Sequence, residues 1–235
     1  MTKSLILSLF FIGFVNCFLF SQEIDTKLSK SKNRPIKKDN FLMDISFDNL
    51  SNAPNGVNFK YGYGNNIQLF YDHQFKAKVL SGAIGLGYSH SKYFTDGFIT
   101  HIDTASGADY STFQTINSVN ADSSFKRNSY TTNYFDIPFE LRFRSTPNIK
   151  GHSWKASLGF KVGFRIGSYT TTRTEAGRFS DFIQPNLTET RYGITARFGY
   201  GRLGLVGYCG LTQLFEANKG HEIIPYSIGF TISPF

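Results

Sequence analysis

The stretch that decides the fold is YFDIPFELRFRS, residues 134–145, because its side chains alternate between two unlike kinds. One kind is apolar and occupies every second position: Phe135, Ile137, Phe139, Leu141 and Phe143. The positions between them carry a different set, with four charged members: Tyr134, Asp136, Pro138, Glu140, Arg142 and Arg144. Successive side chains of a β-strand point to opposite faces, so this period of two predicts a strand with one apolar face.

The same alternation continues along the chain. It is equally regular in WKASLGFKVGFRIG, residues 154–167, and less regular in six further runs: 41–48, 66–75, 80–91, 190–200, 203–214 and 225–235. The composition agrees, because 25 Phe and 13 Tyr favour strands while 22 Gly disfavour long helices. The sequence therefore predicts an all-β chain with eight strands.

The connections between these strands alternate in length. Long links at 49–65, 92–131, 168–189 and 215–224 alternate with short ones near 76–79, at Pro147 and at 201–202. Short periplasmic turns and longer extracellular loops are typical of outer-membrane barrels. We therefore expect an eight-stranded antiparallel up-and-down transmembrane β-barrel. Its longest loop, 92–131, is the expected site of any recognition, since long loops without periodicity are usually functional or disordered.

The size of the side chains indicates which face points outward. The interior of an eight-stranded barrel is just wide enough to be filled by side chains, and the bulky apolar face would not fit inside. The opposite face combines many glycines with long charged residues. We therefore expect the apolar face to meet lipid, with a soluble lipocalin-like ligand carrier as the alternative.

This assignment places charged side chains in the lumen, where burial is costly unless the charges are paired. We predict a structural salt-bridge network formed by eight residues: Asp44, Asp72, Asp136, Glu140, Arg142, Lys161, Arg165 and Arg197. Such a network would plug the barrel and argues against an open pore. The alternative is a proton or ion path.

The N-terminus has the features of a secretory signal peptide. Lys3 precedes an apolar run at 5–20, and the small residue Ser21 follows it. We predict a signal peptide at 1–21, a basic disordered periplasmic tail at 22–40 and the barrel at 41–235. The net charge of +8 does not indicate nucleic acid, because exported proteins rarely meet it. Cys209 remains alone after cleavage, which excludes an intramolecular disulfide.

The segment at 134–145 resembles the fourth strand of PorT-like outer-membrane barrels of the porin family, and the chain from residue 41 onward resembles that class. The resemblance implies the outer membrane of diderm bacteria that often possess type IX secretion and gliding machinery. It implies outer-membrane lipid, the barrel-assembly machinery and other envelope proteins as partners. Two features depart from the class: Phe235 lies on the opposite parity from the apolar face of the last strand, and Pro138 predicts a local break in pairing.

No motif for chemistry stands out. The chain lacks a GxSxG elbow, an HExxH pair, a CxxC pair and a phosphate-binding GK[ST] loop, so we expect no catalytic residue, cofactor or metal. Gly199, Gly201 and Gly204 have dinucleotide-binding spacing, but they lie where a hairpin turn is expected. The crude candidates for an outer-membrane lipid-modifying enzyme cluster near one strand end: Ser89, His90, Ser91 and Asp96.

The sequence thus favours a non-enzymatic outer-membrane barrel with a plugged lumen and a structural or interaction role through its surface loops. A narrow transporter, or an accessory barrel of a secretion or gliding machine, is the first alternative. The lipid-modifying enzyme and the soluble carrier are the others.

Overall fold

The computed structural model describes residues 39–76, 79–103, 109–115, 125–149, 151–175, 177–182 and 186–233. The predicted signal peptide, nearly all of the predicted tail and Phe235 lie outside these residues. The described regular structure consists of strands: β1 (Phe41–Ser51), β2 (Phe59–Gln74), β3 (Leu80–Thr95), β4 (Gly97–Asp103), β5 (Asp109–Thr115), β6 (Phe125–Arg144), β7 (Trp154–Thr174), β8 (Gly177–Asp181), β9 (Thr190–Tyr200), β10 (Leu203–Gly210) and β11 (Ile224–Ile232). Within the described ranges, no helix is long and apolar enough to cross a membrane.

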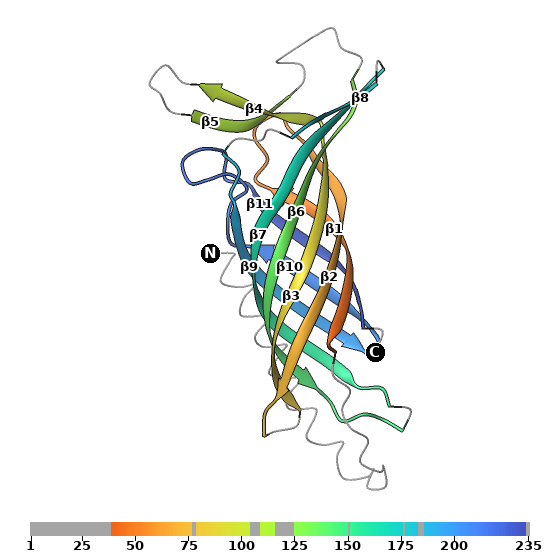
Figure 1. Ribbon diagram of the computed structural model, residues 1–235. Helices are drawn as coiled ribbons and strands as arrows, with labels where there is room; N and C mark the ends of the chain where they lie inside the picture. The colour runs from red at the N-terminus through yellow and green to blue at the C-terminus, as the bar shows by residue number, and fades with distance from the viewer. Residues whose placement is uncertain are drawn as a thin grey trace, which may run out of the picture. The chain divides into compact units, whose positions relative to one another are not determined.

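Eight of these strands close into a barrel (Figure 1). Their order around the barrel is β1, β2, β3, β6, β7, β9, β10 and β11, and β11 pairs with β1 to close it. Every pair is antiparallel. Apart from the closing pair, each barrel strand pairs with the barrel strand that follows it along the chain. The predicted eight-stranded up-and-down barrel is confirmed.

The two faces of the wall are as different as the alternation predicts. Outward-facing apolar side chains are exposed around the wall, for example Phe47 at 59%, Leu158 at 59% and Ile228 at 70%. Inward-facing positions carry small and charged side chains, and most of them are buried. A continuous apolar outer surface is far larger than the patches that soluble monomers expose, so the structure excludes the lipocalin-like alternative.

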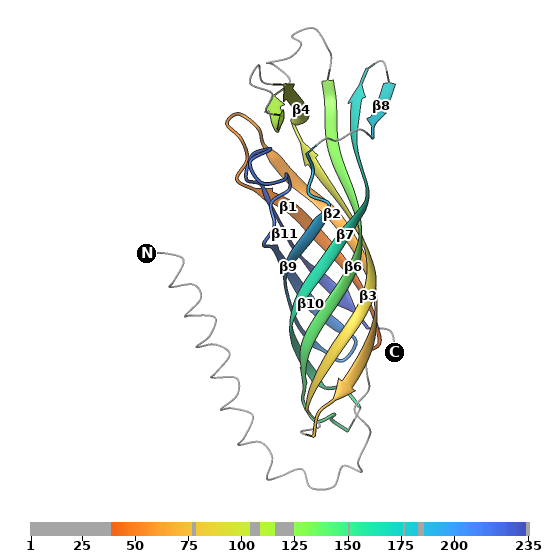
Figure 2. The ribbon, with the colours of Figure 1, turned by 60° about the vertical axis from the view of Figure 1, so that its left-hand side comes forward.

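The strands are longer at one end than the sequence pattern indicates. β2 begins at Phe59, β3 continues to Thr95, β6 begins at Phe125 and β7 continues to Thr174, so the links expected at 49–65, 92–131 and 168–189 consist partly of strand. The loop at 92–131 also contains the β4–β5 hairpin. For β6 and β7 the pattern failed because their extensions, 125–133 and 168–174, are rich in Ser, Thr and Asn on both faces and do not alternate. We call this end the loop end. Figure 1 shows β4, β5 and β8 there, and Figure 2 shows β4 and β8 at the same end.

The opposite end carries the short connections, and we call it the turn end. Gly201 has a φ of +65° in the β9–β10 turn, a backbone conformation that glycine adopts without strain. Gly199, Gly201 and Gly204 lie within this hairpin, and strand β10, not a helix, follows the turn. Pro138 interrupts the pairing of β6 with β3, as the sequence predicts. The β3–β6 ladder has no paired residues between the pairs Ile84↔Phe139 and Gly87↔Asp136, because proline donates no hydrogen bond.

Candidate functional site in the barrel interior

Eight charged side chains at the turn end form what we call the mouth network. The carboxylates are Asp39, which precedes β1, Asp44 on β1, Asp72 on β2 and Glu140 on β6; the cations are Arg142 and Arg144 on β6, Lys155 on β7 and Arg197 on β9. The seven strand residues lie inside the wall because they occupy its inward-facing positions, and Asp39 is buried at the turn end beside them. Four negative and four positive charges balance one another.

The contacts of the mouth network are short and shared. Arg142 lies 2.7 Å from Glu140 and 3.1 Å from Asp72. Arg144 lies 2.5 Å from Asp72, so two arginines share one carboxylate. Arg197 lies 2.6 Å from Asp44 and also pairs with Glu140, which links β9 to β1 and β6. Each of these strands is therefore tied to others across the lumen.

Asp39 joins the ends of three strands at the turn end. Its carboxylate accepts hydrogen bonds from Lys155 at 2.5 Å, Ser233 at 2.6 Å and Arg144 at 3.2 Å. Burial by itself raises the pKa of Asp39, but the bonds from Lys155 and Ser233 and the charges of Lys155 and Arg144 lower it more, so the pKa is below its usual value. The segment 22–40 was expected to be a tail, yet its residue Asp39 is buried in the barrel.

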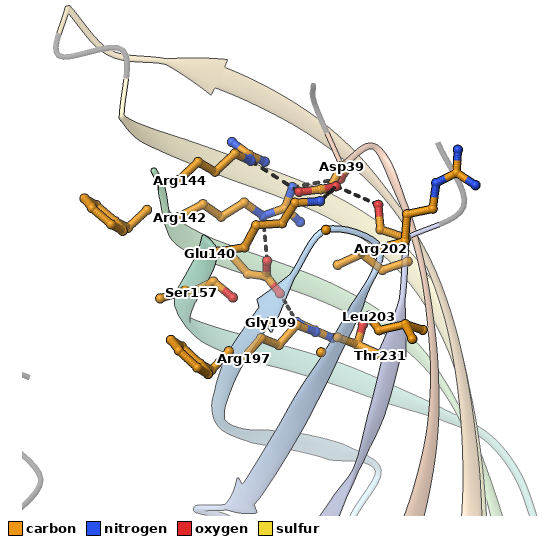
Figure 3. Close-up of a pocket in the computed structure, with 18 residues that line it drawn as sticks. Asp39, Glu140, Arg142, Arg144, Ser157, Arg197, Gly199, Arg202, Leu203 and Thr231 are labelled. Carbon is orange, nitrogen blue, oxygen red and sulfur yellow. Dashed lines mark hydrogen bonds and ion pairs between the residues drawn. The ribbon is translucent and has the colours of Figure 1, made fainter. Parts of the chain in front are cut away.

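A small cavity of about 50 Å³ adjoins the mouth network (Figure 3). Arg142, Arg197 and Thr231 are among the residues that line it. Arg142 Nη2, Arg197 Nε and Thr231 Oγ1 are buried and have no hydrogen-bond partner within the described part of the chain. A polar cavity of this size has room for a few water molecules, and it is too small for a drug-sized ligand.

A second group, which we call the middle cluster, surrounds Asp136 on β6. Lys161 on β7 lies 3.3 Å from Asp136, Arg191 on β9 lies 3.2 Å from it, and Ser89 on β3 donates a hydrogen bond to it. The Arg191 guanidinium carbon also lies 3.8 Å from the ring centroid of Tyr134. These contacts cross the lumen farther from the turn end and fill its middle section.

Glycines make room for the long side chains of this interior. A Cβ at Gly163 would lie 2.3 Å from Asp136 Oδ1 and 2.9 Å from Arg191 Nε. A Cβ at Gly159 would lie 2.5 Å from Thr195 Oγ1. Small residues and charged residues therefore fill the narrow lumen together.

Seven of the eight predicted lumen residues lie in these two groups and form ion pairs: Asp44, Asp72, Asp136, Glu140, Arg142, Lys161 and Arg197. Arg165 does not join them. Its side chain is only partly buried and donates to Ser168 Oγ at 3.1 Å and to the Leu187 carbonyl at 3.2 Å. Arg165 thus contacts a loop instead of a carboxylate, because it lies at the loop end beside an extra residue in β7.

Sequence reasoning missed four members of the two groups. Arg144, Lys155 and Arg191 share the inward parity of predicted residues on their strands, and that signal could have found them. Asp39 lies before the first alternating residue, so the pattern contains no signal for it.

Apolar side chains cover the lumen at the loop end, and we call this group the loop cap. Its members come from strand ends, loops and the β4–β5 hairpin: Leu50, Val57, Tyr93, Phe113, Tyr130, Leu187, Leu214, Phe215 and Ile223. Phe113 lies 6.1 Å from Phe215 and 6.2 Å from Tyr130, measured between ring centroids. Backbone bonds such as Ser111 N to Lys219 O at 2.9 Å tie the loops together. Several loops are therefore packed into one core.

The residues considered for an enzyme do not converge. Ser89 is buried in the lumen, whereas His90 bonds Asn133 Oδ1 through Nδ1 at 2.8 Å, and Asp96 accepts two hydrogen bonds from Asn58. Among the described residues, no three His, Cys, Asp or Glu are grouped to hold a metal ion.

A closed antiparallel barrel with an apolar outer surface and a charged interior defines the class of membrane β-barrels. The chain belongs to the outer membrane protein beta-barrel domain family, because the model of that family matches residues 41–216. No curated protein matches the chain. A solved structure described as "Asymmetric conductivity of engineered proteins" aligns with 82% of this chain and 98% of its own at 10% identity, and its TM-score of 0.20 supports no inference.

Proposed function

We propose that this protein is a non-enzymatic barrel of the outer membrane whose lumen is plugged, and that it has a structural or interaction role through the surface at its loop end. The observation that carries the proposal is the filled interior. The mouth network and the middle cluster occupy the lumen at two levels, and the loop cap covers its far end.

The energetics of the interior favour a permanent plug over a gated path. Removing one partner from a buried ion pair costs about 3–5 kcal/mol, because the other charge stays buried without compensation. An ion or a proton path would have to break several shared pairs at once. A narrow transporter is therefore the weaker candidate.

The family and the outer surface of the barrel support the proposed location in the outer membrane. The exposed apolar wall requires a lipid environment, and the short turns and longer connections suit a periplasmic turn end and an extracellular loop end. Outer-membrane lipid and the barrel-assembly machinery are the expected partners, together with other envelope proteins. No nucleic acid or cofactor is expected.

Planar-bilayer recording of the purified full chain tests the plug. We expect no steady conductance, because charged side chains fill the lumen. The control is the same preparation run on a denaturing gel with and without boiling, where a mobility shift shows that the barrel is folded. A folded preparation with a steady conductance would refute the plug and favour the transporter.

Co-purification from cross-linked outer membranes tests the interaction role. If the protein is a PorT-like accessory barrel of a secretion or gliding machine, specific envelope proteins should be recovered together with the folded barrel. The enzyme alternative instead predicts that His90→Ala changes the lipid A profile of the cells. We expect that profile to stay unchanged, because His90 bonds Asn133 and has no serine or carboxylate partner among the described residues.

A further inference from the structure

Two arginines lie opposite one another on neighbouring strands at the loop end. The register pairs Arg173 on β7 with Arg178 on β8. Residues directly opposite one another in an antiparallel pair share a face and lie about 5 Å apart at Cβ. Like charges in that arrangement destabilise the sheet, which makes the pair a candidate anion site.

Both arginines are open to solvent. Arg173 and Arg178 are exposed, and neither side chain has an ion pair or a hydrogen bond within the described part of the chain. A guanidinium is planar and carries five donors, which suits bidentate contact with phosphate. These arginines therefore have free binding capacity on the outside of the molecule.

Two lysines extend the basic character of this side of the barrel. Lys60 on β2 and Lys92 on β3 occupy outward-facing register positions. Glu175 and Asp181 flank Arg178 in sequence, but Asp181 is opposite Thr170 and therefore lies on the other face of the sheet from Arg178. We call Lys60, Lys92, Arg173 and Arg178 the basic strip.

The outward face of β7 shows the depth at which the strip lies. Phe164 and Ile166 are exposed apolar residues, Tyr169 follows on the outward register, and Arg173 lies two outward positions beyond Tyr169. Aromatic rings of this kind sit at the level of lipid headgroups. The strip therefore begins where the apolar wall ends, and flexible arginine side chains reach back toward that boundary.

We propose that the basic strip binds the phosphate groups of lipids in the outer leaflet that surrounds the barrel. The proposal rests on the proposed outer-membrane location with the loop end facing outward. Free inorganic phosphate has the same chemistry, but the position of the strip at the edge of the apolar wall favours the lipid. Each basic residue near an anionic surface is worth about 1 kcal/mol, or about fivefold in affinity.

Native mass spectrometry of the detergent-purified full chain tests the proposal with lipid A, a diphosphorylated glycolipid, as the probe. We expect lipid adducts on the wild type and an affinity about 25-fold lower in Arg173→Gln/Arg178→Gln, from about fivefold for each arginine. Arg173→Lys/Arg178→Lys should retain most of the binding because it keeps the charge. Lys76→Gln, which removes an exposed cation near the turn end, should bind like the wild type.

Three results would overturn the proposal: equal binding by the double glutamine variant, equal binding of a phosphate-free glycolipid, or loss of the lipid adducts at millimolar inorganic phosphate. The last result would assign the strip to free phosphate. A mobility shift on unboiled gels shows that each variant is folded. If the protein were instead soluble and showed no shift, the proposed membrane location would have failed, and that outcome is distinct from a folded barrel that binds no lipid A.

Discussion

At the scale of single residues, Asp39 holds the chain entering β1 against β6, β7 and the end of β11. The seam between β1 and β11 closes the barrel, so a contact at this point stabilises the closed form. The sequence patterns that predict the tail and the strands assign no role to Asp39. Its contacts are visible only in the folded chain.

We predict that Asp39→Asn lowers the free energy of unfolding by about 3 kcal/mol, because it leaves Arg144 and Lys155 without their shared carboxylate. Urea unfolding followed by the fluorescence of Trp154, the protein's one tryptophan, measures the change. The control is Glu216→Gln, which breaks an exposed pair with Lys219 and should cost under about 1 kcal/mol. Equal effects of the two variants would contradict the role of Asp39.

The same residue predicts a pH dependence. Its pKa is lower in the folded protein than the value of about 3.9 in an unfolded chain, so it stabilises the fold above that value. This contribution decreases as the pH falls through the folded pKa. The difference in unfolding free energy between the wild type and Asp39→Asn should therefore be constant near pH 7 and shrink below about pH 4. A difference that stays the same at pH 3 would argue against it.

A glycine inside the middle cluster gives a third test. Gly163→Ala should destabilise the barrel by about 1–3 kcal/mol, because the added methyl overlaps Asp136 and pushes against Arg191. Gly207→Ala is the matched control, since its Cβ would meet nothing closer than Ser227 O at 4.0 Å. Both variants are compared by urea unfolding, and a cost at Gly207 as large as that at Gly163 would show that strand glycines matter for another reason.

At the scale of elements, each barrel strand has a lipid-facing side and a lumen side, and β7 shows the contrast most clearly. Its outward residues Leu158 and Ile166 are 59% and 62% exposed, whereas the inward Lys161 is 3% exposed. A strand of about 10 residues spans a bilayer, so the 21 residues of β7 reach well beyond it. The excess pairs with β8 and carries Arg173.

The lipid-facing assignment predicts the effect of a charge on that side. Leu158→Arg should cost about 2–4 kcal/mol near the middle of the bilayer and reduce the yield of heat-modifiable barrel. Ile149→Arg, in the β6–β7 connection where the side chain is 75% exposed, should fold like the wild type. If Leu158→Arg folded as well as Ile149→Arg in lipid vesicles, this face of β7 would not contact lipid.

At the scale of the whole molecule, two kinds of core hold the barrel together. The turn end and the middle depend on ion pairs between strands, whereas the loop end depends on the apolar loop cap. The two cores share no residue, so one should loosen without the other.

We therefore predict that Phe113→Ala, at a position 2% exposed in the loop cap, makes the loop end sensitive to protease on intact cells. The heat-modifiability of the barrel should remain, because Phe113 contacts neither ionic group. Phe179→Ala, in β8 where the side chain is 60% exposed, is the control and should keep the wild-type cleavage pattern. Loss of the mobility shift in Phe113→Ala would show that the cap is needed for the barrel itself.

The sequence by itself determined the barrel and its two faces. Alternation between neighbours is a local property, and the bulk of Phe139 or Leu158 on one side, against Gly159 or Gly163 on the other, indicates which side fits inside a narrow lumen. The strand ends were less predictable, because the Ser- and Thr-rich extensions of β6 and β7 alternate weakly and form strands by pairing with each other.

Only the tertiary structure decided which charges meet. Asp39 and Ser233 are 194 positions apart, and Asp44 and Arg197 are 153 apart, so closure of the barrel brings each pair together. The loop cap is decided in the same way, since Phe113 and Phe215 become neighbours only when distant loops fold over one lumen. Local alternation fixes the direction of a side chain, whereas its partner depends on the register and closure of the entire sheet.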